Sequence, residues 1–200
     1  MALRATFSLE AFQRDGFCIF EVLPPAEVAH FRGLLDALVA KGDTEDPFHE
    51  PELADLCFHP TLIGAAATAL RCDPEAILLD NLKTYAWDAG EKYRQGWHRD
   101  TLHSAEHRQW LGATFDELIT AIEQGRWDHN NVQGHLALMD DHGFRAVPGS
   151  HCRPFTAEER EAFGDLSELC HDDASIAAGR AIVVPAGHAI WYNNNLIHSG

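Results

Sequence analysis

Basic residues are scarce in this chain: 15 Lys and Arg stand against 31 Asp and Glu, which gives a formal net charge of −16. Nucleic-acid binding needs Lys and Arg to neutralise phosphates, and docking on anionic lipid needs basic clusters, so this charge argues against both. No apolar run approaches the ~20 residues that span a bilayer. The first residues carry one Arg with no apolar signal core behind it. We therefore expect a cytoplasmic protein with no nucleic-acid or membrane partner.

The cysteine patterns of a disulfide framework or a zinc site are also missing. The five cysteines are odd in number, and no two of them form a C-x-x-C pair. A reducing compartment is the simpler interpretation. Histidine, in contrast, is plentiful, with 13 copies among 200 residues. Because imidazole titrates near neutral pH and ligates metals, this is a first indication of metal or proton chemistry.

Helical patterns occupy the N-terminal part of the chain. Ser8 is placed to cap a short helix that stops near Gly16, and apolar residues recur at helical spacing over 26–40. An Ala-rich stretch over 62–70 predicts another helix. The polar residues 43–51 predict a loop between them.

Strand-like segments dominate from residue 77 onwards, after a first strand expected at 17–22. Residues 101–128 interrupt them with a helical pattern, which we expect to form an insertion or lid. The order predicts one α+β, β-rich domain over 1–200, a sandwich or jelly roll with N-terminal helices packed on one sheet. The later strands are expected at 77–87, 132–139, 181–184 and 190–197.

The segment Trp97-His98-Arg99-Asp100 carries the first candidate ligands. In an extended segment alternate side chains share a face, so His98 and Asp100 point together while Arg99 points away. An imidazole nitrogen beside a carboxylate oxygen suits a divalent transition metal. The pair alone also fits a solvated loop, because H-x-D occurs often by chance.

A further candidate, His198, ends the strand expected at 190–197 and lies 100 residues beyond His98. It can meet the H-x-D pair only if a non-local sheet joins them, as a jelly roll does. Two His and one carboxylate on one face of an iron leave three positions open, the arrangement of non-haem Fe(II) oxygenases. A strand-end His bonded to a neighbouring carbonyl is the competing interpretation.

Four motifs occur in a characteristic order: W-H-x-D from Trp97, V-Q-G-H-L-A-L-M-D-D from Val132, V-P-G-S-H from Val147 and L-I-H-S from Leu196. The phrase F-Q-R-D-G-F-C-I-F, from Phe12, precedes them. Over nearly the whole chain this order resembles the phytanoyl-CoA dioxygenase (PhyH)-like family of Fe(II)/2-oxoglutarate-dependent oxygenases. The resemblance implies a double-stranded β-helix (jelly roll, cupin-like) core.

The resemblance also implies a chemistry. His98, Asp100 and His198 would hold Fe(II), and 2-oxoglutarate would chelate the ion as co-substrate. O2 would then oxidise a small organic metabolite, with release of succinate and CO2. Related halogenases lack the carboxylate and place a halide there, so Asp100 favours hydroxylation.

Contacts to 2-oxoglutarate follow from the same resemblance. Gln133 sits where the family commonly has Gln facing the site, and Ser199 lies near a small hydroxyl residue that helps hold the co-substrate. Lys83 and Tyr85 could also reach it, although a solvated Lys and a packed Tyr are the commoner interpretation. The Arg that the family carries after the distal His, a bidentate partner for a carboxylate, would lie beyond Gly200. We expect a chain that lacks its C-terminal strand, or another co-substrate contact.

Other polar residues have simpler interpretations. His103 and His107, one helical turn apart, could bind a metal but fit the lid as well. The adjacent polar residues 140–142 lie in an expected turn and cannot all face one ion. His151, after Pro-Gly-Ser, is expected to be structural.

The charge balance also bears on the substrate. A CoA thioester carries several phosphates and needs a basic patch, so a compact neutral or cationic metabolite is favoured. Two alternatives stay open: a catalytically silent metal-binding or sensor module on the same fold, and a cupin-like metalloenzyme without co-substrate. The oligomeric state stays open as well. The only local basic group comprises Lys92, Arg94, Arg99 and Arg108.

Overall fold

The computed structural model describes residues 6–41, 47–79, 96–100, 120–121, 124, 131–164 and 176–200. The helices are α1 (Leu9–Asp15), α2 (Pro25–Ala40), α3 (Pro51–Cys57), α4 (Pro60–Leu70) and α8 (Ala157–Phe163). The strands are β1 (Phe17–Glu21), β2 (Val132–Leu136), β3 (Arg145–Ala146), β4 (Arg180–Ala181), β5 (His188–Asn193) and β6 (His198–Ser199). Short 3-10 turns cover Pro47–His49, Pro74–Ala76 and Ser150–Cys152.

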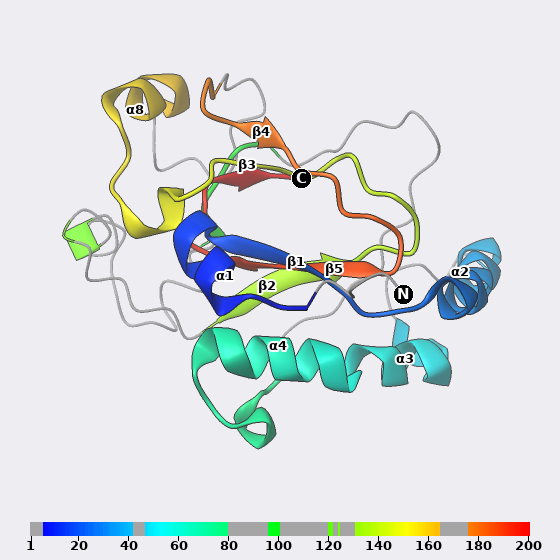
Figure 1. Ribbon diagram of the computed structural model, residues 1–200. Coiled ribbons are helices and arrows are strands. Elements are labelled where there is room, and N and C mark those ends of the chain that lie inside the picture. The colour runs from blue at the N-terminus through cyan, green and yellow to red at the C-terminus, as the bar shows by residue number, and fades with distance from the viewer. Residues whose placement is uncertain are drawn as a thin grey trace.

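The strands form two antiparallel sheets, ordered β1-β5-β2 and β4-β3-β6. Figure 1 shows α3 and α4 beneath the first sheet, with β3 and β4 above it. The first sheet is therefore a middle layer between helices and the second sheet, as expected of an α+β domain with helices on one sheet.

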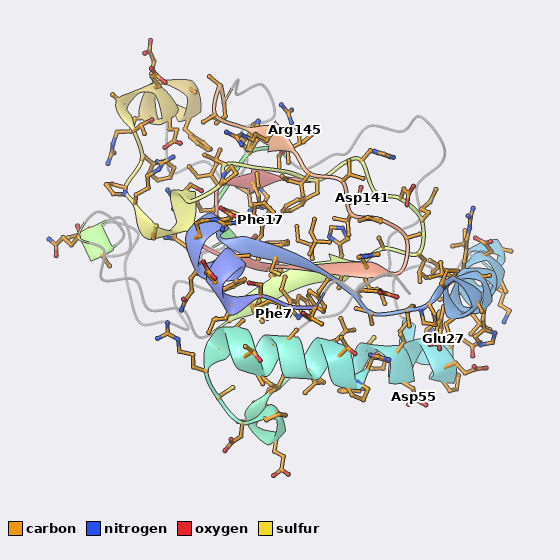
Figure 2. The ribbon with its side chains drawn as sticks, in the orientation of Figure 1. Phe7, Phe17, Glu27, Asp55, Asp141 and Arg145 are labelled. Carbon is orange, nitrogen blue, oxygen red and sulfur yellow. The ribbon has the colours of Figure 1, made fainter. Side chains whose placement is uncertain are left out.

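Strand β5 shows how the two faces of the middle sheet differ, because successive side chains of a strand point to opposite faces. Ala189 and Trp191 pack in the cluster that faces α3 and α4, together with Leu56 and Leu62. Figure 2 places Phe7 between this sheet and α4. The residues in between belong to the cluster between the sheets: Ile190 and Tyr192, with Phe144, Ala146, Val184 and Leu196.

The start of the chain is fixed where α1 meets β1. The hydroxyl of Ser8 accepts from the Ala11 amide at 3.2 Å, which confirms the predicted cap. Gly16 ends the helix with φ of 85°, a conformation that favours glycine. A Cβ there would lie 2.6 Å from Nδ1 of His151, so the close packing of the turn excludes a side chain as well.

Most predicted helices and strands have counterparts, with shifted ends. The helices expected at 26–40 and 62–70 are α2 and α4, and the strand at 17–22 is β1. The strand expected at 132–139 ends at Leu136. The strand expected at 181–184 is shorter in the structure, where β4 covers only Arg180–Ala181. The helices α3 and α8 were not predicted. Of the strand at 77–87, only residues 77–79 are described, without strand structure, and nearly all of the insertion at 101–128 lies outside the described residues.

One boundary error concerns a candidate ligand. The strand expected at 190–197 stops at Asn193, and His198 begins β6 instead of ending a single strand. The side chain of Asn193 accepts from the Asn195 amide at 2.8 Å. Such an Asx turn reverses the chain, so the polypeptide passes from the first sheet to the second between Asn193 and His198.

The helical stretch Pro51–Leu70 is long and apolar enough, by length and composition alone, to cross a membrane, with mean hydropathy 1.3. It comprises α3 and α4, with Phe58 and His59 between them. Its Leu56, Leu62 and Ala65 pack against the middle sheet. Core packing therefore accounts for part of its apolar composition, since 39% of the stretch is buried.

Candidate metal centre

Backbone pairing brings His98 and His198 together. The amide of His98 donates to the carbonyl oxygen of His198 at 2.9 Å. The amide of His198 donates in return to the carbonyl oxygen of His98 at 3.0 Å. The two imidazole rings lie 4.3 Å apart, centroid to centroid. A two-bond antiparallel bridge thus joins segments 100 residues apart, as the sequence required of any shared site.

Asp100 completes the group from the same side of the H-x-D segment. Its Oδ1 lies 3.3 Å from Nε2 of His98, and its Oδ2 lies 3.4 Å from Nε2 of His198. One ligand atom from each of the three residues lies within 4.8 Å of the other two. Two nitrogens and one oxygen therefore converge on a common point.

The remaining ring nitrogens are held by backbone carbonyls. Nδ1 of His98 lies 2.7 Å from the carbonyl oxygen of Gly96, and Nδ1 of His198 lies 3.0 Å from that of Leu196. A carbonyl only accepts, so each Nδ1 carries the proton and each Nε2 of the neutral ring presents a lone pair. Donation of the second ring N–H to a carbonyl is the arrangement that orients metal-binding histidines.

The centre is shielded from water on the side of His198. The side chains of His98 and His198 are 1 % and 4 % exposed, and that of Asp100 is 15 % exposed. The ring of Tyr192 lies 4.7 Å from the His198 ring, and that of Phe144 lies 5.7 Å from it. Asp100 is therefore the most exposed of the three side chains, although its Oδ2 is itself buried.

Arg99 points away from the ligands, as predicted, but it does not reach the surface. It is 2 % exposed, and its guanidinium carbon lies 4.3 Å from the centroid of the Phe155 ring. Burial lowers the pKa of Arg99 to about 9, which the Glu159 carboxylate partly opposes, so the guanidinium stays charged at neutral pH. Arg99 therefore lies in the core behind the candidate ligands and adds no surface charge to the local basic group that the sequence contains.

The predicted 2-oxoglutarate contacts are placed in part. Gln133 on β2 pairs with Tyr192 on β5, so the two side chains share one face of the sheet. This is the face from which Tyr192 packs toward the candidate ligands. Ser199 pairs with Arg145, and the alternation of β6 directs it to the face opposite His198. Lys83 and Tyr85 lie outside the described residues, as do His103 and His107.

The residues at 140–142 stabilise a turn. Oδ1 of Asp140 accepts from the Ala186 amide at 2.8 Å, and Oδ1 of Asp141 accepts from the Gly143 amide at 2.7 Å. Oδ2 of Asp141 also lies 2.9 Å from Nε2 of His135, a pair that the sequence did not indicate. Burial raises the pKa of Asp141, but His135 and the Gly143 amide outweigh it, so the net pKa is lowered and the carboxylate stays charged.

His151 has the structural role expected of it. Its Nε2 lies 3.1 Å from the carbonyl oxygen of Gln13 at the end of α1. Two residues beside the ligands, Phe144 and Tyr192, were missed by sequence reasoning. No motif separates such aromatic neighbours from ordinary core residues, although the strand alternation of β5 could have indicated Tyr192.

Comparison with solved structures shows the fold. EvdO2 from Micromonospora carbonacea var. aurantiaca is 17% identical, with a TM-score of 0.58 over 99% of this chain and 85% of its own. The epimerase SnoN, solved with Fe3+, alpha ketoglutarate and nogalamycin RO, is 14% identical, with a TM-score of 0.58 over 96% and 74%. EctD from S. alaskensis with bound Fe is 17% identical, with a TM-score of 0.53 over 95% and 68%. No family model and no curated protein matches the sequence.

Proposed function

We propose that this chain is a non-haem Fe(II)- and 2-oxoglutarate-dependent dioxygenase of the PhyH-like family. The observation that carries the proposal is the convergence of His98, Asp100 and His198, whose ligand atoms lie within 4.8 Å of one another. Its support is the likeness in fold to proteins solved with iron and with 2-oxoglutarate.

The three side chains fit an iron ion. Both Nε2 atoms carry lone pairs because the Nδ1 protons are donated to the carbonyls of Gly96 and Leu196. The Asp100 carboxylate lies beside both imidazoles and supplies one negative charge. Two His and one carboxylate on one face of an octahedral ion leave three positions open for co-substrate and O2.

When bound, Fe(II) with 2-oxoglutarate supplies an oxidation by O2 that forms succinate and CO2. The task of the protein is ligation, orientation and shielding. His98 and His198 would hold the ion from two paired segments, and the rings of Tyr192 and Phe144 would exclude water beside His198. Asp100 keeps its carboxylate at the position that a halide would need, which favours hydroxylation as the outcome.

The proposed fold is a double-stranded β-helix, a jelly roll or cupin-like core, in which the two sheets face each other around the ligands. Residues 1–200 form one oxygenase domain in this proposal, with 101–128 as a helical insertion or lid. Gln133, Lys83 and Tyr85 are proposed to contact 2-oxoglutarate, whereas the alternation of β6 turns Ser199 to the face opposite His198 and away from this role. Since Gln133 shares a sheet face with Tyr192, it is the contact that the described geometry supports best.

The proposed substrate is a compact neutral or cationic metabolite in the cytoplasm. The net charge of −16 disfavours a polyanion. The burial of Arg99 removes one more cation from the surface near the ligands. SnoN was solved with nogalamycin RO and EctD with 5-hydroxyectoine, which are both small molecules.

The test is succinate formation by anaerobically Fe(II)-loaded protein given 2-oxoglutarate, O2 and a panel of small neutral and cationic metabolites. Stoichiometric succinate and oxidised product support the proposal. Calorimetric titration of 2-oxoglutarate into the metal-loaded protein is the companion measurement. Metal binding without 2-oxoglutarate binding or succinate would contradict the proposal and favour the silent metal-binding or sensor module.

A further inference from the structure

The residue between the two ligands of the H-x-D pair makes contacts that the proposed function does not use. Nη1 of Arg99 donates to the carbonyls of Ser150, at 3.0 Å, and Asn195. Nη2 donates to the carbonyl of Arg153 at 3.3 Å. One side chain thus joins the H-x-D segment to residues 51, 54 and 96 positions further along the chain.

Two of these carbonyls belong to the backbone that positions His198. Asn195 lies in the turn between β5 and β6, three residues before the ligand. The carbonyl oxygen of Ser150 accepts from Arg99, and the hydroxyl of the same residue accepts from the Ile197 amide at 2.8 Å. The contacts therefore run from Arg99 through Ser150 to the residue immediately before His198.

The two ligand segments are consequently joined twice. On the ligand side, the backbones of His98 and His198 exchange two hydrogen bonds. On the opposite side, the Arg99 guanidinium bonds the turn that leads into His198. Two separate attachments fix both the distance and the relative rotation of the segments, whereas the backbone pair alone would leave the segments free to hinge.

The chemistry of Arg99 also argues for a geometric role. Its acceptors are three neutral carbonyls and its guanidinium lies against the Phe155 ring, so within the described residues no carboxylate bonds this cation directly. Burying a charge is costly, and apolar replacement of buried charges is often neutral or stabilising. Stability alone is therefore a poor reason for Arg99, while its planar fork suits several acceptors in fixed directions.

We propose that Arg99 is a positioning residue, which sets the spacing of the His98–Asp100 and His198 segments and thereby the affinity of the site for a divalent metal. The inference rests on the proposed metal centre. It predicts an effect on metal binding in the folded protein, separate from any effect on unfolding.

The experiment titrates Co(II), as an oxygen-stable probe, into the metal-free full-length protein and its Arg99→Met and Arg99→Lys variants. Loss of outer contacts to metal ligands typically weakens affinity about 10- to 100-fold, and we expect a rise in Kd of that order for Arg99→Met. Arg99→Lys should recover little of it, because an ammonium cannot reach three carbonyls in fork geometry. The Co(II) absorption spectrum of both variants should change with the ligand geometry.

The matched control is Arg145→Met. Arg145 lies on β3 with its guanidinium 5.0 Å from the Trp97 ring, next to the same segment but without the carbonyl contacts of Arg99. Removing this cation should leave the Co(II) affinity unchanged, which separates loss of charge from loss of positioning. If Arg99→Met does not fold, Arg99→Lys decides the question.

The outcomes are distinct. Wild-type affinity in folded Arg99→Met, or full recovery in Arg99→Lys, would overturn the positioning role and leave the metal centre intact. A wild-type protein that binds no Co(II) would overturn the metal centre and with it this inference. A lower melting temperature with unchanged Kd would show that Arg99 is only structural, which also overturns the proposal.

Discussion

Two buried polar clusters lie on either side of Arg99, and they are built on opposite principles. In the pair of Arg153 and Glu159, two guanidinium nitrogens each donate to one carboxylate oxygen at 2.7 Å, and Thr156 donates its amide to the same carboxylate at 2.8 Å. In the group of His98, Asp100 and His198, two lone-pair nitrogens and a carboxylate converge. The first cluster is complementary within itself, while the second is complementary to a cation.

This difference distinguishes polar side chains that stabilise the fold from polar side chains that bind a ligand. A buried ion pair with matched donors and acceptors contributes to the fold, and its loss should appear in the free energy of unfolding. Two imidazoles and a carboxylate whose ligand atoms converge instead match the donor set of a divalent transition metal. Substitutions in the two clusters should therefore move different observables.

The largest effect is expected from Asp100→Ala. Removing the carboxylate takes away one of three ligands and the only anionic one, so Fe(II)-dependent succinate formation should fall to background. Because Asp100 is the most exposed of the three, the fold should tolerate the change. Retained turnover, measured with the wild-type protein in parallel, would rule out Asp100 as a ligand.

Arg153→Met should affect stability instead of chemistry. It leaves Glu159, which is 4 % exposed, without its guanidinium partner. Removing one partner of a buried pair costs about 3–5 kcal/mol, and the exposure of Arg153 places the expected loss near the lower end. Urea unfolding measures the loss, and an unchanged Kd for Co(II) completes the contrast with the Arg99 variants.

The acid limit of stability should follow Glu159. Burial raises the pKa of Glu159, but Arg153 and the Thr156 amide outweigh it, so its pKa in the folded protein lies below the usual value of 4.5. A lowered folded pKa means that its stabilisation is present above the unfolded pKa and is lost as pH falls through the folded value. The unfolding free energy should therefore decrease below about pH 4.5, and Glu159→Gln should reduce that dependence. An equally steep pH dependence in Glu159→Gln would assign the effect to other carboxylates.

Thr156→Ala should give the smallest effect. The Thr156 hydroxyl accepts from the Glu159 amide at 3.1 Å as the N-cap of α8. Loss of an N-cap side chain typically costs about 1 kcal/mol. Denaturant unfolding should detect that loss with metal affinity unchanged. Weakened Co(II) binding in this variant would show that the two clusters are coupled.

The candidate site was predicted from the sequence because it leaves two signals there: a short local spacing and a fixed order of motifs along the chain. The H-x-D spacing puts two side chains on one face of an extended segment, and the motif order supplied His198 as their distant partner. The capping box of α8 was also readable, as Thr156 followed three residues later by Glu159, although it was not recognised.

The remaining features depend on contacts that no local pattern encodes. Arg99 finds its acceptors among backbone carbonyls, which every residue has, so nothing in the sequence distinguishes Ser150 or Asn195 as partners. The strand boundary before His198 was missed because the Asn193 side chain reverses an otherwise apolar run. Both errors concern geometry behind the candidate ligands.

The central claim is that His98, Asp100 and His198 bind one iron ion. Anomalous diffraction at the iron edge, from crystals of Fe(II)-loaded protein grown without oxygen, tests it most directly. The account predicts a single strong anomalous peak within bonding distance of Nε2 of both histidines and a carboxylate oxygen of Asp100. Full iron loading with the peak bonded to other residues, or no peak at these three, would contradict it.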